Sequence, residues 1–384
     1  MIVECLKCNA KYKIDERKLG DKGKKVSCSK CKNIFTVKPE IKPGELLQKQ
    51  AVNAPISPKG PVGLDIGTSH IVMATHDEVG AAKFSNQLNA FFNIPESNIT
   101  KQILKDKGVN FFTNKESIYI FGFSALEFAS IFNKNMRRPI DKGILSPKEK
   151  DGIRVIGNIL KTMISPPEML GEKLCLVIPG EPYQSPGSVI YHASLLKRFL
   201  SNIGFNPITL NEGMATVMAE LIDTDYTGIG ISMGGGMCNV CFSYLTVPII
   251  TYSIQKGGDY IDFMTSSAVG ESETKIKMIK ENELNLSIKP KNRIIEALNI
   301  FYNELVNDLI QSLQRAIDLS DNIPRLSRSI PIALSGGTVL PKGFLNLFKK
   351  ALYHNPLPVH TSEVRIVNDP LTTTSRGALK IAIS

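Results

Sequence analysis

VGLDIGTSHIVMA, residues 62–74, sets two short apolar stretches on either side of a run of small residues. Val62–Ile66 and Ile71–Ala74 have the length and apolar composition of buried strands. Gly67–Ser69 lie between them and suit a tight turn, because glycine and small hydroxyl residues punctuate strands. The sequence therefore predicts a strand–turn–strand unit at this point.

The same pattern returns later in the chain, in GIGISMGGGMCNVCFS. Ile229–Ser232 and Val240–Ser243 are the expected strands, and Gly234–Gly236 form the expected turn. Small residues let backbone N–H groups approach phosphate oxygens closely, so each turn is a candidate anion-binding nest. A single glycine hairpin is common and is often purely structural. Two similar hairpins in one chain indicate an internal duplication.

The rest of the chain beyond residue 60 alternates strand-like and helix-like stretches. Leu174–Ile178 predict a buried strand, and a helix is expected over residues 186–202. Residues 293–319 carry apolar side chains at helical spacing, which predicts a long amphipathic helix. Ile330–Leu334 predict another strand. The mixed order makes this an α/β protein.

The bulk composition is that of a globular protein with two or three domains: 384 residues, 42% of them hydrophobic and 21% charged. No apolar run approaches the ~20 residues that a membrane-spanning helix needs. The N-terminus reads MIVEC and then turns lysine-rich, without the apolar stretch and small-residue cleavage site of a secretory signal. We therefore expect a cytoplasmic protein without a transmembrane segment.

The net charge of +10 is concentrated at the N-terminus. Residues 1–40 hold eleven Lys and Arg against five Asp and Glu, so this segment supplies +6 of the total. Such a basic module suits nucleic acid, an anionic membrane surface or an acidic protein partner. A lysine-rich surface that only keeps a small domain soluble fits equally well. Nothing else in the sequence supports nucleic acid as a partner.

Four of the seven cysteines form two pairs, Cys5-x2-Cys8 and Cys28-x2-Cys31, with 19 residues between the pairs. This is the spacing of a four-cysteine zinc site. So short a segment buries too little apolar surface to fold alone, and a reducing cytoplasm disfavours disulfides. A structural Zn²⁺ ion is therefore expected, with all four ligands thiolates and no open position for catalysis. The segment also resembles the short zinc ribbon at the N-termini of many bacterial proteins.

The domain boundaries follow from these patterns. The ribbon is expected to span residues 1–38, with short strands at Lys11–Ile14, Lys24–Ser27 and Ile34–Val37. Residues 39–60 contain four prolines and two glycines without a hydrophobic period, which predicts a flexible linker. Residues 61–384 form the remaining domain.

Residues 61–384 resemble the bacterial actin-like proteins of the MreB and MamK type, in the actin superfamily. VGLDIGTSHIVMA is similar to their first phosphate loop, and GISMGGGMCNV is similar to the second. The other segments that look like these relatives are NEGMATVMAE (211–220), LSGGTVLPKGF (334–344), GGDYID (257–262), IKE (279–281), RRPIDKGIL (137–145) and DPLTTTSRGALKIA (369–382). The resemblance implies two lobes built on duplicated ribonuclease-H-like subdomains, preceded here by a small β zinc ribbon.

The resemblance also implies a nucleotide site made by both halves of this domain. Asp65 would hold a magnesium ion through water, and Glu212 would orient the attacking water or accept its proton. The phosphate-binding residues implied are Gly67, Thr68, Ser69, Gly234, Gly235 and Gly236. The nucleoside-binding residues implied are Lys280, Glu281, Gly336, Gly337 and Thr338. ATP is the expected nucleotide, with GTP as the alternative.

The second phosphate loop departs from the pattern of the relatives. They usually carry an aspartate at its start and hydroxyl residues after its glycines, whereas this chain has Ser232 and then Met237 and Cys238. Losing that carboxylate weakens the arrangement of magnesium and water on which hydrolysis depends. We therefore expect nucleotide binding with hydrolysis that is slow or absent.

Two functions fit this pattern. The first is a filament-forming cytoskeletal protein, whose subunits stack head to tail and serve cell shape or organelle positioning. The second is a non-polymerising adaptor that resembles FtsA and PilM and binds ATP while recruiting partners through the zinc ribbon. The altered second loop favours the adaptor. The expected partners are further copies of the chain and an unidentified protein that binds the ribbon.

Overall fold

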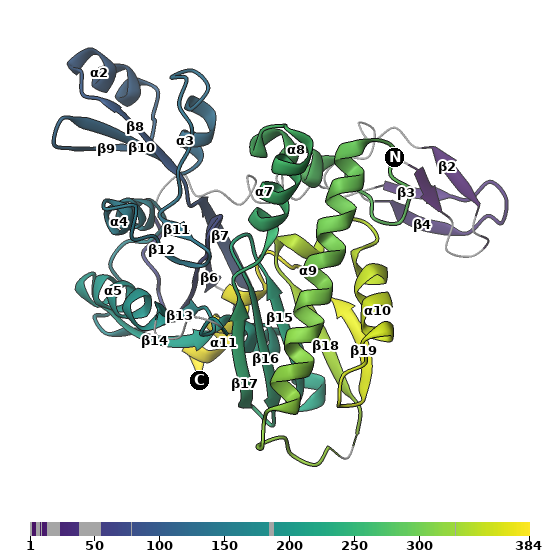
Figure 1. Cartoon of the computed structure of the whole chain (residues 1–384). Helices are drawn as coiled ribbons and strands as arrows, with labels where there is room; N and C mark the ends of the chain where they lie inside the picture. The colour runs from purple at the N-terminus through teal and green to yellow at the C-terminus, as the bar shows by residue number, and fades with distance from the viewer. Residues whose placement is uncertain are drawn as a thin grey trace. The chain divides into compact units, whose positions relative to one another are not determined.

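The computed structural model of the chain describes residues 2–4, 8, 10–13, 24–37, 55–77, 79–183, 188–326 and 328–384 (Figure 1). Contacts divide the chain into two units, Met1–Leu46 and Leu47–Ser384. The first unit is the N-terminal ribbon. The second is the body that carries both glycine turns.

The described residues of the ribbon form two antiparallel strand pairs. Strand β1 (Ile2–Glu4) pairs with β2 (Lys11–Lys13), and β3 (Lys24–Ser27) pairs with β4 (Ile34–Val37). β3 and β4 coincide with predicted strands, whereas β1 was not predicted. The backbone N–H of Cys28 donates to the carbonyl of Asn33 at 2.8 Å. This bond closes the knuckle between β3 and β4, so the second cysteine pair lies at the tip of a hairpin.

The body contains two five-stranded sheets, one in each lobe (Figure 1). The lobe I strands are β5 (Val62–Ile66), β6 (His70–His76), β7 (Ala82–Leu88), β13 (Glu172–Ile178) and β14 (Phe205–Asn211). The lobe II strands are β15 (Gly228–Met233), β16 (Cys238–Tyr244), β17 (Val247–Ile254), β18 (Ile330–Ser335) and β19 (Thr361–Ile366).

The two sheets have the same topology. Their strand orders are β14-β13-β5-β6-β7 in lobe I and β19-β18-β15-β16-β17 in lobe II. In each sheet the first three strands of this order are parallel, and the last two are added antiparallel. The predicted internal duplication and α/β class are therefore confirmed.

Helices cover the two sheets (Figure 1). Lobe I has α4 (Gly152–Met163) and α5 (Ser188–Asn202); lobe II has α7 (Gly258–Val269), α8 (Glu273–Asn282), α9 (Arg293–Asp318) and α10 (Phe344–His354). The predicted long helix is α9, and its apolar face is buried in the lobe II core through residues such as Leu298, Leu305 and Leu309. Asn292 caps its N-terminus, since its side chain accepts a hydrogen bond from Ile295 N.

Two further helices, α6 (Glu212–Glu220) and α11 (Thr373–Ile383), join the lobes. α6 follows the last strand of lobe I but packs on β15 and β16 of lobe II, whereas α11 follows the last strand of lobe II and packs on β5 and β13 of lobe I. Glycines permit this approach. A Cβ at Gly230 in β15 would collide with the backbone of α6, and one at Gly377 in α11 would overlap the carbonyl oxygen of Ala215. Each lobe therefore contributes one helix that packs on the sheet of the other lobe.

A small subdomain is inserted into lobe I. Its elements are β8 (Phe91–Pro95), α2 (Asn98–Asp106), β9 (Phe111–Asn114), β10 (Ser117–Phe121) and α3 (Phe123–Phe128). They enclose a separate core that includes Phe92, Leu104 and Ile118. A short hairpin of β11 (Ile140–Asp141) and β12 (Ile144–Leu145) then returns to lobe I. None of these elements was predicted from the sequence.

Residues 55–60 fall within the expected linker, yet they are bound to lobe I. Ile56 N donates to Met163 O at 3.0 Å, and Ser165 N donates to Ile56 O at 2.9 Å. The Ser57 hydroxyl donates to Pro166 O at 2.8 Å. These residues therefore belong to the folded body and not to a free linker.

Candidate nucleotide site

The two glycine turns have matching local geometry. Gly67 N donates to His70 O at 2.9 Å, and Gly234 N donates to Met237 O at 3.0 Å. Each bond closes the turn between the first two strands of a lobe, β5–β6 in lobe I and β15–β16 in lobe II. The two turns therefore occupy equivalent positions in the two sheets, as expected from the duplication.

The turns face each other between the lobes, as the resemblance implied. A Cβ added to Gly235 would lie 2.7 Å from Ser69 Oγ, and one added to Gly236 would overlap Thr68 Oγ1. The turns are therefore in direct contact, and a side chain on Gly236 would also collide with the backbone nitrogen of Gly143, at 2.7 Å. Thr68 also accepts a hydrogen bond from Gly143 N at 3.2 Å, which joins the β11–β12 hairpin to this contact.

Two carboxylates lie beside the turns. Asp65 is near the end of β5, and Glu212 is the first residue of α6. Burial raises the pKa of Asp65 to about 6, although the hydroxyl of Thr374 donates to it. Burial, together with the charge of Asp65, raises the pKa of Glu212 to about 8. The raised pKa values mean that the ionised forms of these two neighbouring groups are disfavoured. A divalent cation stabilises the ionised forms, so this pair fits a hydrated Mg²⁺ ion.

Ser232 is bound directly to Glu212. Its hydroxyl donates to Glu212 Oε1 at 2.6 Å, and the Asn239 amide donates to Glu212 Oε2 at 2.6 Å. Asn239 is fully buried, and its own carbonyl oxygen accepts from Gly180 N at 2.8 Å. Both oxygens of the candidate catalytic carboxylate therefore already have donors. Sequence reasoning missed Asn239, although a buried amide in the apolar strand CNVCFSY was a visible signal.

The raised pKa values predict how stability depends on pH. The folded body holds a proton on Asp65 up to about pH 6 and one on Glu212 up to about pH 8, whereas the unfolded chain has released both by about pH 5. The free energy of unfolding should therefore fall as pH rises, by about 2–3 kcal/mol between pH 6 and pH 8, mainly through Glu212. Urea unfolding of the protein without magnesium or nucleotide at both pH values measures this. Glu212→Gln should flatten the dependence, and an equal slope in this variant would contradict the assignment.

The implied nucleoside residues gather beside the second turn. Lys280 donates to Gly258 O at 2.8 Å and forms an ion pair with Asp262 at 2.7 Å. The Thr338 hydroxyl donates to Gly234 O at 2.8 Å. Glu281 is more exposed and lies 3.9 Å from Lys277. Lys280 and Thr338 are therefore brought to the glycine turn, whereas Glu281 lies at the outer side of the same helix end.

Gly336 and Gly337 follow β18 and enter a short 3₁₀ turn, Gly337–Val339. Gly336 has φ 91°, in the left-handed region that favours glycine, and a Cβ there would collide with the backbone of Met233. This close approach brings the segment onto the end of β15. GGDYID, one of the segments that resemble the actin-like proteins, forms the start of α7, since only Gly257 precedes the helix.

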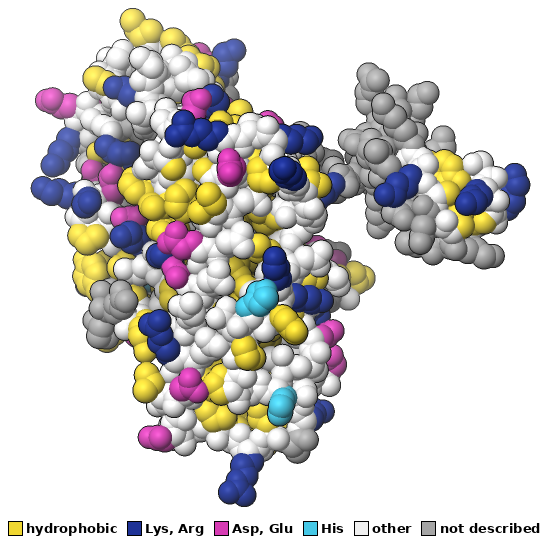
Figure 2. Space-filling view, turned by 45° about the vertical axis from the view of Figure 1, so that its right-hand side comes forward, with side chains coloured by type: hydrophobic (Ala, Val, Ile, Leu, Met, Phe, Trp, Pro, Cys, Tyr) yellow, Lys and Arg dark blue, Asp and Glu magenta, His cyan; other side chains and the backbone are white. Residues whose placement is uncertain are grey.

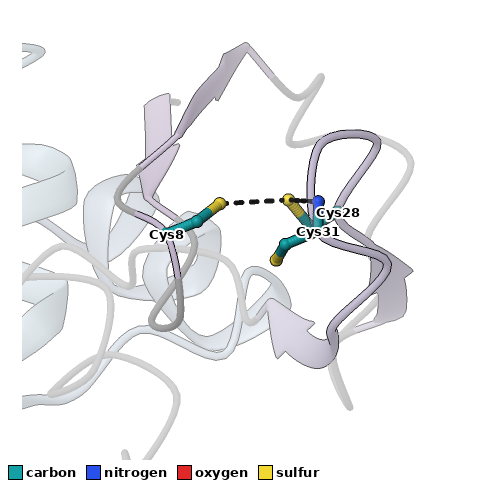
Figure 3. Close-up of side chains that lie close together, drawn as sticks. All are labelled: Cys8, Cys28 and Cys31. Carbon is teal, nitrogen blue, oxygen red and sulfur yellow. Dashed lines mark hydrogen bonds between the residues drawn. The ribbon is translucent and has the colours of Figure 1, made fainter.

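In the ribbon, three of the four expected zinc ligands lie together (Figure 3). The sulfur atoms of Cys8, Cys28 and Cys31 are all within 4.8 Å of one another, and Cys8 Sγ lies 3.6 Å from Cys28 Sγ. Two thiolates on one tetrahedral zinc ion are separated by about 3.8 Å. The Tyr12 hydroxyl, 3.0 Å from Cys28 Sγ, is the main cause that lowers the pKa of Cys28 to about 6. Cys5 lies outside the described residues.

Four lysines among the described residues of the ribbon are exposed. Lys11, Lys25, Lys30 and Lys32 all face solvent. On the face of the body drawn in Figure 2, basic and acidic side chains are interspersed. This face gives no further support to nucleic acid as a partner.

The folds of known proteins agree with this arrangement. The MamK double helical filament structure has a TM-score of 0.60 at 18% identity, covering 84% of this chain and 98% of that chain. MreB 5 of Spiroplasma citri bound to AMPPNP has a TM-score of 0.60 at 15% identity, covering 84% and 95%. The ethanolamine utilization protein EutJ from Carboxydothermus hydrogenoformans has a TM-score of 0.52 at 15% identity, covering 88% and 94%. None of the curated proteins matches the sequence.

Two lobes with exchanged helices and facing glycine turns are the features of an actin-like fold, and the likeness to the MamK and MreB 5 structures shows that the body has this fold. Residues 61–382 match the volactin family, so the chain belongs to the volactin family. Residues 1–36 match a zinc-ribbon domain, which confirms the predicted N-terminal ribbon. Among the described residues, no helix combines the length and apolar character needed to cross a membrane.

Proposed function

We propose that the body binds a magnesium nucleoside triphosphate between its two glycine turns, and that the chain assembles into cytoskeletal filaments. The observation that carries this proposal is the pairing of the turns across two lobes, with Asp65 and Glu212 beside them. The turns touch in this structure, so a phosphate chain enters only when the lobes separate. The filament structure of MamK and the AMPPNP complex of MreB 5 support the proposal by likeness of fold.

In the proposed complex each group of residues has one task. Asp65 holds the magnesium ion through water, and the ion supplies positive charge to the phosphates. Backbone N–H groups of Gly67–Ser69 and Gly234–Gly236 bind phosphate oxygens. Glu212 orients water near the phosphates. Lys280, Glu281 and the segment Gly336–Thr338 bind the nucleoside, which is ATP in the primary proposal and GTP in the alternative.

Hydrolysis is proposed to be weak because Ser232 stands where the relatives usually carry an aspartate, whose carboxylate would help to hold magnesium and water. The Ser232 hydroxyl instead donates a hydrogen bond to one oxygen of Glu212. Ser232→Asp should therefore raise phosphate release from MgATP by about tenfold or more. Ser232→Ala is the matched control, since it removes the donor to Glu212 Oε1 without adding a carboxylate. Release by the wild-type protein at the rate of an ordinary bacterial actin would contradict the proposal.

A sedimentation assay distinguishes a filament-forming protein from a non-polymerising adaptor. The purified chain is centrifuged with MgATP and with Mg-AMPPNP over a range of protein concentrations. A filament-forming protein pellets above a threshold concentration with either nucleotide, and electron microscopy of the pellet shows polymers. A non-polymerising adaptor, which the hydrogen-bonded Ser232–Glu212 pair favours, stays in the supernatant at every concentration.

The ribbon is proposed to bind one structural zinc ion through Cys5, Cys8, Cys28 and Cys31, and to recruit a protein partner. The three described sulfur atoms converge at a spacing that suits the ion. Exposed lysines around them suit an acidic surface on that partner.

A further inference from the structure

Several contacts cross from lobe I to lobe II beside the glycine turns. Close approaches of uncharged groups join Ser69 to Gly235, Thr68 to Gly236, and Gly143 to Met237. An ion pair also crosses here, in which Arg138 Nη1 donates to Asp259 Oδ2 at 2.6 Å. Arg138 precedes the β11–β12 hairpin, whose Ile140 is part of the lobe I core, and Asp259 lies in the first turn of α7 in lobe II.

Asp259 lies against the second glycine turn. Its backbone N–H donates to Gly235 O at 2.8 Å. A Cβ on Gly235 would lie 3.2 Å from Asp259 Oδ2 and 2.7 Å from Ser69 Oγ, so the carboxylate borders the place where both turns meet. Burial alone would raise the pKa of Asp259, but the charge and hydrogen bond of Arg138 lower it below its usual value. The carboxylate therefore carries its negative charge at the edge of the phosphate site.

The neighbouring charges have other partners. Lys280 is held by Asp262 at 2.7 Å, and Lys277 lies 3.9 Å from Glu281. Arg138 and Asp259 form the tightest ion pair of this group and the one that touches the turns. An anion that enters between the turns therefore meets the charges of this pair first.

We propose that Arg138 is a phosphate-binding residue that Asp259 holds in the nucleotide-free body and gives up when the phosphate chain enters. This inference rests on the proposed function. The phosphates repel the adjacent carboxylate and attract the guanidinium, whose forked donors fit two phosphate oxygens. Asp259 is thus an internal competitor of the nucleotide, and breaking the cross-lobe pair is coupled to filling the cleft.

The two partners should therefore have opposite effects on affinity. Arg138→Gln removes a charged hydrogen-bond donor from the complex and should weaken Mg-AMPPNP binding by about ten- to a hundredfold. Asp259→Asn removes the competitor and should strengthen binding by about two- to tenfold. In the double variant the gain from Asp259→Asn should disappear, because there is no longer an arginine to release.

Isothermal titration of the full chain with Mg-AMPPNP measures these affinities, and thermal melts check that each variant is folded. Arg137→Gln is the matched control: it removes the same charge one residue earlier, where the side chain is exposed and pairs with Glu149 at 3.2 Å. Opposite shifts for the two variants, with Arg137→Gln unchanged, support the proposal. Weaker binding in both, as expected of a merely structural ion pair, overturns it.

Two further outcomes are decisive. If Arg138→Gln binds as tightly as Arg137→Gln, the role of Arg138 is wrong while the proposed nucleotide site stands. If the wild-type chain takes up neither Mg-AMPPNP nor MgGTP, the proposed function fails and the role of Arg138 fails with it.

Discussion

Cys28→Ser is expected to unfold the ribbon and leave the body folded. Cys28 is almost fully buried, and its sulfur lies within reach of Tyr12, Cys8 and Cys31, so the site depends on it. The described ribbon consists of two short strand pairs and has little apolar surface to bury. Structural zinc contributes about 10 kcal/mol or more to the folding of such modules. Losing one thiolate should therefore abolish the folded ribbon.

Metal content and proteolysis test this expectation. Plasma emission spectrometry should give one zinc per wild-type chain and almost none for Cys28→Ser. Brief trypsin treatment should remove the variant's N-terminus, because the unfolded backbone around its lysines can enter the protease, and the mass of the remaining body should be intact. Lys30→Ser changes an exposed residue of the same knuckle and should behave as wild type. Full zinc content in Cys28→Ser would disprove the site.

Gly377→Ala is expected to destabilise the body strongly, although alanine normally favours a helix by about 1 kcal/mol over glycine. The added Cβ would overlap the carbonyl oxygen of Ala215 at the crossing of α11 and α6. The helices have no flexible side chain to move aside at this point, so the backbones must separate. Overpacking of this kind costs about 3 kcal/mol, which outweighs the gain in helix propensity.

Urea unfolding of the two proteins gives the difference directly, as a lower transition midpoint for the variant. Gly60→Ala is the control, because a Cβ on Gly60 would have no atom within 4 Å. A midpoint for Gly377→Ala equal to that of the control would show that the helices do not cross so closely. A variant that cannot be purified in folded form, beside a well-behaved control, supports the same conclusion as a lowered midpoint.

Local patterns were enough to predict the glycine turns and the strands next to them. β5 has the predicted bounds, and β15, β16 and β18 are longer than the predicted strands by two, three and one residues. These strands are short, apolar and bounded by small residues, so their signal is complete within a few positions. The α/β class and the zinc ribbon followed from the same kind of local evidence.

What the sequence did not reveal depends on partners that are distant in the chain. The inserted subdomain between β7 and α4 does not repeat the glycine-rich strand–turn–strand pattern that marked the two hairpins. The hydrogen bonds of Glu212 come from Ser232 and Asn239, and the Arg138–Asp259 ion pair joins residues 121 positions apart. The segments of these two charged residues were recognised by resemblance, but only the fold shows that they meet.

The exchange of α6 and α11 makes each half of the body depend on the other. A fragment that ended after α6 would leave the sheet of lobe I without the helix that completes its core, and would expose the face of α6 that belongs on lobe II. The repeated unit is thus equivalent to one subunit of a domain-swapped dimer whose two copies have been joined into one polypeptide. Melting of the body should accordingly be a single cooperative event, because neither half can lose its structure while the other keeps its own.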